Sequence, residues 1–88
     1  MNRASDFIMK IWCKGIPNGT KFMELSHEGS GGMSIDFWKE SDRILATKIL
    51  GSHMATYSSN IVEISSDVEF MLYVKTIEHR IDLSITLL

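Results

Sequence analysis

Residues 34–50 read Ser-Ile-Asp-Phe-Trp-Lys-Glu-Ser-Asp-Arg-Ile-Leu-Ala-Thr-Lys-Ile-Leu, and this stretch decides the fold that the sequence predicts. At about 100° per residue its large apolar side chains fall on one arc and its charged side chains on the opposite one, as in an amphipathic helix. Ser34 is a suitable N-cap, and Gly51 stands where the glycine that ends a helix is usually found. The stretch therefore predicts a central helix whose apolar face consists of Phe37, Trp38, Ile44, Leu45 and Ile49.

Two glycine-containing strings border the predicted helix. Gly29-Ser30-Gly31-Gly32 precedes it and has the composition of a flexible designed linker. Gly51-Ser52-His53-Met54 follows it and matches the string that remains after a protease removes an expression tag. We therefore interpret 29–32 and 51–54 as engineered joints of a fused or permuted chain, in which the flanking segments hold helix 34–50. A natural continuous sequence is the alternative, because Gly-Ser is also an ordinary loop dipeptide.

Length and composition indicate a single small domain over residues 1–88. The chain is 44% hydrophobic and 23% charged, with a net charge of −2, which is ordinary for a globular domain. A domain this small buries only about 60% of the surface of its unfolded chain, so a partner or dimer contact would add stability. The sequence has no basic stripe of the kind that binds phosphate backbones, and nucleic acid is not an expected partner.

The cysteine content and hydropathy indicate the compartment. Cys13 is the only cysteine, which excludes an internal disulfide and favours a reducing environment. There is neither an apolar run of the ~20 residues that a membrane-spanning helix needs nor a signal peptide. We therefore expect a cytoplasmic protein that has no membrane partner.

Two strands are predicted before the central helix. Residues 6–14 fit a strand, and they also fit a short helix that Ser5 would cap. We favour the strand because the Pro-Asn-Gly string at 17–19 is a tight-turn signal. With residues 20–27 as the partner, the two strands would form a hairpin.

The segments after the central helix give mixed signals. Residues 55–60 are small and polar and predict a loop, whereas 61–64 have the β-branched content of a short strand. Residues 66–80 begin with a capping box and have apolar side chains at helical spacing, so we expect a second helix there, with a strand as the alternative. Residues 81–87 alternate without interruption and predict a strand.

Together these elements predict an α+β fold, in which a small mixed sheet carries the central helix. A hairpin followed by a packed helix and further strands resembles the architecture of β-grasp domains in topology, although no motif of that family accompanies it. The terminal strand 81–87 has no lysine, proline or bulge of the kind that protects a sheet edge, so we expect a homodimer.

Few residues indicate chemistry. His27, His53 and His79 lack the spacing of zinc ligands, and we expect neither a metal nor another cofactor. No phosphate-binding loop or nucleophile elbow is present. Cys13 lies beside Trp12 and is more typical of a small core residue than of a nucleophile. We therefore do not expect an enzyme, and the alternative is a small cysteine-dependent hydrolase or transferase that uses Cys13 with a histidine.

The aromatic pair Phe37-Trp38 is the most informative feature for function. Both rings would fit a core under a sheet, but aromatic residues on a helix face are also typical anchors of a protein contact. We therefore predict a non-enzymatic protein-interaction module that binds a protein or peptide through the apolar residues of 34–50. A natural small regulatory or inhibitory protein is a further alternative.

Overall fold

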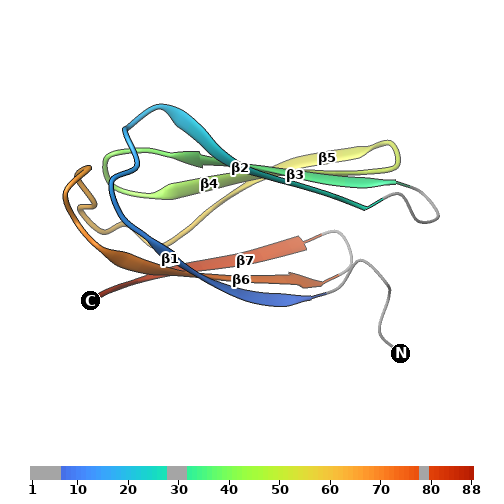
Figure 1. Cartoon of the computed structure of the whole chain (residues 1–88). Coiled ribbons are helices and arrows are strands. Elements are labelled where there is room, and N and C mark those ends of the chain that lie inside the picture. Colours follow the sequence, from blue (N-terminus) through green and yellow to red (C-terminus); the bar gives the residue numbers. More distant parts are fainter. Residues whose placement is uncertain (1–6, 28–31, 78–79) are drawn as a thin grey trace.

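The computed structural model describes residues 7–27, 32–77 and 80–88. These residues contain strands and no helix, and the strands form two layers that face each other (Figure 1). No part of the described chain forms a helix that could cross a membrane. In chain order the strands are β1 (Ile8–Cys13), β2 (Thr20–His27), β3 (Met33–Lys39), β4 (Ile44–Leu50), β5 (His53–Ser58), β6 (Phe70–Ile77) and β7 (Arg80–Leu87).

The strands form a β-sandwich. The larger sheet has the order β2-β3-β4-β5, the smaller sheet has the order β1-β6-β7, and all their pairs are antiparallel. β7 lies against β4 and β5 of the opposite sheet, which leaves β1 on the side of β2 and β3 (Figure 1). The core lies between the sheets, and its fully buried members include Ile35, Phe37, Ile44, Leu72 and Val74.

The predicted central helix is wrong, because residues 34–50 form most of β3 and all of β4. The signal of a strand is alternation, and in this stretch two lysines interrupt it. Lys39 and Lys48 point into the sandwich and are almost fully buried, at positions where the pattern of a strand calls for apolar residues. When the two lysine positions are left out, the remaining apolar residues fit the arc of an amphipathic helix as well as they fit the alternation of a strand.

The second helix expected at 66–80 is also wrong, since Phe70–Ile77 is strand β6. β6 is the middle strand of the smaller sheet and pairs with β1 on one side and with β7 on the other. Contacts with two neighbouring strands stabilise this segment as a strand more than the local capping box stabilises it as a helix. The α+β class and the mixed β-grasp-like sheet are therefore replaced by an all-β, fully antiparallel sandwich.

Three of the predicted strands are present, but one of them has a different partner. The strands predicted at 20–27 and 81–87 are confirmed as β2 and β7. Residues 6–14 contain β1, which pairs with β6 rather than with β2. The predicted hairpin is therefore wrong, and residues 14–19 instead carry the chain from one sheet to the other.

The segment around 55–64 also differs from the expectation. β5 occupies most of the region that was predicted to be a loop. Residues 61–64 form no strand, although the N–H groups of Val62 and Ile64 donate to the carbonyls of Asp42 and Ser41. This connection therefore lies along the β3–β4 turn and closes one end of the sandwich.

The two glycine-containing strings have different places in the structure. Gly51 and Ser52 form the tight turn between β4 and β5, where Leu50 pairs with His53. Gly51 has a φ of 62°, in the left-handed region that favours glycine. Of the other string, residues 29–31 lie outside the described part of the chain.

Candidate functional site

The outward side of the four-stranded sheet is the candidate site. Apolar side chains lie there in two cross-strand pairs, Trp38 with Leu45 and Ile49 with Met54. The exposed fraction is 39% for Trp38, 39% for Ile49 and 72% for Met54. We call this surface the large-sheet face and define it by Glu24, Asp36, Trp38, Leu45, Ile49 and Met54.

The backbone of the two middle strands determines which side chains reach this face. Successive side chains of a strand point to opposite sides of its sheet. In β3 the inward residue Phe37 is fully buried, so its neighbour Trp38 points outward. β3 and β4 each have a hydrogen-bonded neighbour on both sides. Trp38 and Leu45 are therefore presented on a well-supported surface.

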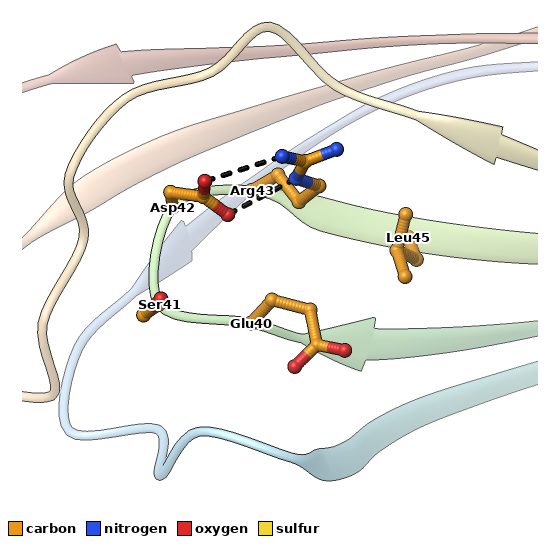
Figure 2. A pocket seen from close by; sticks show the side chains of 5 residues that line it. All are labelled: Glu40, Ser41, Asp42, Arg43 and Leu45. Atoms are coloured by element: carbon orange, nitrogen blue, oxygen red, sulfur yellow. Dashed lines mark hydrogen bonds and ion pairs between the residues drawn. The ribbon is translucent and has the colours of Figure 1, made fainter.

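A shallow hollow adjoins the large-sheet face at the turn between β3 and β4. It has a volume of about 370 Å³ and is lined by Glu40, Ser41, Asp42, Arg43 and Leu45 (Figure 2). The guanidinium of Arg43 donates to both carboxylate oxygens of Asp42, at 3.0 and 3.2 Å. These hydrogen bonds lower the pKa of Asp42 and raise the pKa of Arg43. The hollow thus has a fixed ion pair on its rim.

The large-sheet face carries an excess of negative charge beside its apolar residues. Glu24 and Asp36 are cross-strand neighbours on β2 and β3. Lys21 forms an ion pair with Glu24 at 3.0 Å, and the pKa of Lys21 is raised first by this hydrogen bond and then by the charge of Asp36. One lysine therefore faces two carboxylates.

The structure divides the five predicted interaction residues between the large-sheet face and the core. Trp38, Leu45 and Ile49 lie together on the large-sheet face, whereas Phe37 and Ile44 are fully buried in the core. Met54 was missed because its string resembled a tag remnant. Its position opposite Ile49 depends on the β4–β5 hairpin. In the sequence, only the glycine at the turn could have indicated that hairpin.

Cys13, the residue considered as a nucleophile, belongs to the hydrophobic core. Cys13 is buried, with its Sγ 3.8 Å from the carbonyl oxygen of Ile11. This burial raises the pKa of the thiol to about 11. Among the residues that the structure describes, no group of three or more His, Cys, Asp and Glu side chains could hold a metal ion. His79 lies outside the described residues.

Comparison of the chain with protein-family models, with curated proteins and with solved structures gives no match.

Proposed function

We propose that this chain is a non-enzymatic protein-interaction module that binds a protein partner through its large-sheet face. The observation that carries the proposal is the position of Trp38. This large ring lies on the outer side of a middle strand, where 39% of it is exposed, although the same strand offers core positions. Tryptophan is among the residues that contribute most to binding energy at protein interfaces.

The neighbours of Trp38 support a partner of defined chemistry. Leu45, Ile49 and Met54 extend the apolar area along β4 and β5, and the hydrogen-bonded pair Thr47 and Thr56 lies between them. Glu24 and Asp36 add negative charge on one side. A flat protein surface with apolar residues and basic side chains complements this face.

The chemistry of Cys13 favours binding over catalysis. A thiol whose pKa is about 11 is almost entirely protonated at neutral pH, and the protonated form is a poor nucleophile. A single buried, free cysteine is also compatible with a reducing compartment, so we propose a cytoplasmic location for this activity.

A display library of random peptides tests the proposal without a known partner. Peptides selected on the wild-type protein are assayed against Trp38→Ser and against Ile61→Ser, a matched change of an exposed apolar residue in the connection before β6. We expect a class of peptides that loses binding to Trp38→Ser and keeps binding to Ile61→Ser. A selection in which every peptide binds both variants equally would contradict the proposal.

A further inference from the structure

The outward side of the three-stranded sheet is a second exposed face with a large apolar content. Trp12 pairs with Met71 across the strands, and Lys10 pairs with Tyr73. The exposed fraction is 66% for Trp12 and 62% for Ile8. We call this surface the small-sheet face and define it by Ile8, Lys10, Trp12, Met71, Tyr73 and Lys75.

The ring of Trp12 is oriented by a polar contact. Its Nε1 donates to Glu69 at 3.2 Å, and the other carboxylate oxygen of Glu69 forms an ion pair with Lys14, also at 3.2 Å. An exposed aromatic ring that is already oriented loses little conformational entropy when it binds.

The two outer faces carry opposite charge. On the small-sheet face and at its Trp12 end, the basic residues Lys10, Lys14, Lys75 and Arg80 outnumber the acidic residues Glu69 and Asp82. On the large-sheet face Glu24 and Asp36 outnumber Lys21. At the end of that face, the β3–β4 turn adds Glu40 and Asp42 against Arg43. The molecule is therefore polarised across the sandwich, although its net charge is only −2.

The order of residues along the two faces also corresponds. Trp12 and Trp38 lie at the same end of the sandwich, because residues 14–19 join the end of β1 to the start of β2, which pairs with the end of β3. Two residues further along the strands, Lys10 lies on one face and Asp36 on the other, with Glu24 beside Asp36. Both faces thus have an aromatic row followed by a charged row of opposite sign.

We propose that the large-sheet face binds the small-sheet face of a second copy of this chain. The inference rests on the proposed function and names the partner. A shift of one copy across the sandwich, perpendicular to its sheets, places the end of the small-sheet face that carries Trp12 against the end of the large-sheet face that carries Trp38. Because β1 lies on the side of β2 and β3 (Figure 1), the same shift places Lys10 on the side of the acidic pair Glu24 and Asp36.

The symmetry of the proposed contact is open. The contact joins two different surfaces, and such a contact leaves one face free at each end. Copies therefore add in a row as concentration rises, instead of stopping at a closed dimer.

Reversal of the charge at Lys10, or at Asp36, tests this arrangement. Lys10→Glu makes the small-sheet face repel the large-sheet face, and Asp36→Lys does the same from the other side. In sedimentation velocity over a hundredfold concentration range, we expect wild type to associate and each variant alone to lose about tenfold or more in association constant. An equimolar mixture of the two variants should associate again, because each contact between unlike copies joins opposite charges. Added salt should weaken the wild-type contact.

Two comparisons make the result specific. Glu63→Lys changes the net charge by the same amount as Asp36→Lys, but lies in the exposed connection before β6, and it should associate as wild type does. Circular dichroism of all variants confirms that they are folded. Association that is unchanged in Lys10→Glu would overturn the inference and indicate another contact, such as pairing along the edge of β7.

The outcomes for this inference and for the proposed function are separable. A wild-type protein that stays monomeric throughout overturns the self-contact, whereas peptides that need Trp38 would still support the interaction module. If mixing fails to restore association that both variants have lost, the pairing of these two faces is wrong.

Discussion

At the scale of single residues, Phe37 and Trp38 show how one backbone step separates a core residue from a surface residue. Phe37 is fully buried and packs against Phe22, with ring centroids 6.3 Å apart. Trp38 faces outward beside Leu45. Phe37 therefore contributes to the core, and Trp38 is left available for the contact that we propose.

This separation predicts unequal effects of truncation. Phe37→Ala should cost about 3–5 kcal/mol of unfolding free energy, since a buried ring is lost and a cavity remains. Trp38→Ala should cost about 1 kcal/mol or less, the range of a cross-strand contact on a partly exposed face. Urea denaturation of both variants measures the difference. Equal losses would mean that Trp38 belongs to the core.

Cys13 gives a second prediction at this scale. Because burial raises its thiol pKa to about 11, a thiol reagent at neutral pH should modify the native protein far more slowly than the urea-unfolded protein. The time course of labelling under both conditions is the measurement. Labelling of the native protein as fast as that of the unfolded chain would support the alternative of a cysteine-dependent enzyme.

Lys39 gives a prediction about pH. Its Nζ donates to Asn18 at 2.6 Å and to the carbonyl of Glu40 at 3.0 Å, yet burial lowers its pKa from the usual 10.5. The native state therefore binds this proton less tightly than the unfolded state does. Burial of the charged amine therefore lowers the free energy of unfolding. This loss is fully present below the lowered pKa of Lys39 and is relieved as pH rises toward 10.5.

Replacement by an apolar side chain should remove this dependence. We expect Lys39→Met to be at least as stable as wild type at neutral pH, and to lack the part of the alkaline gain that Lys39 supplies. Urea titrations of both proteins at a series of alkaline pH values give the difference. A variant that is less stable at neutral pH and follows the same pH curve would contradict this account.

At the scale of elements, the smaller sheet leaves β7 at an edge, as order β1-β6-β7 requires. The side chain of Asn60 covers part of that edge. Its Oδ1 accepts from the N–H of Ile85 at 2.7 Å, and its Nδ2 donates to the carbonyl of Ile85 at 3.2 Å. One amide thereby replaces one residue of a neighbouring strand.

Removal of this amide should weaken the fold and expose the edge. Asn60→Ala should cost about 1–3 kcal/mol, because two backbone groups lose their partner. It should also promote association along β7, since unprotected edges pair readily. Thermal melts and light scattering measure the two effects. Ser84→Ala, an exposed change on the same strand, is the control and should alter neither. An Asn60→Ala protein as stable as wild type would contradict the edge role.

At the scale of the whole molecule, distant parts of the chain are joined. Trp12 on β1 contacts Glu69, which lies 57 residues later, just before β6. The two sheets share one core, and each middle strand is hydrogen-bonded to a neighbour on both sides. The protection of backbone amides from hydrogen exchange should therefore depend on the position of a strand within its sheet rather than on its position along the chain.

Hydrogen exchange tests this expectation. Amides of β3, β4 and β6 should exchange slowest and those of the edge strands β2 and β5 faster. Far-ultraviolet circular dichroism should show a β-sheet spectrum without the helical double minimum. A helical spectrum, with continuous protection through 40–43, would restore the central helix and refute the sandwich.

The sequence by itself determined the features that depend on local pattern. Uninterrupted alternation identified the strand at 81–87, and the turn signal at 17–19 favoured strands at 6–14 and 20–27. Trp38, Leu45 and Ile49 were also selected from the sequence, as members of the apolar face of the predicted helix 34–50.

Only the tertiary structure decided which periodicity applied to 34–50 and 66–80. A helix is stabilised by contacts within its own segment, whereas a strand depends on neighbours that are distant in sequence. The inward-facing Lys39 and Lys48 concealed the alternation of β3 and β4, and the pairing of β1 with β6 lies beyond any local pattern. The two oppositely charged faces exist because the sandwich gathers Lys10 with Lys75, and Glu24 with Asp36, from separate parts of the chain.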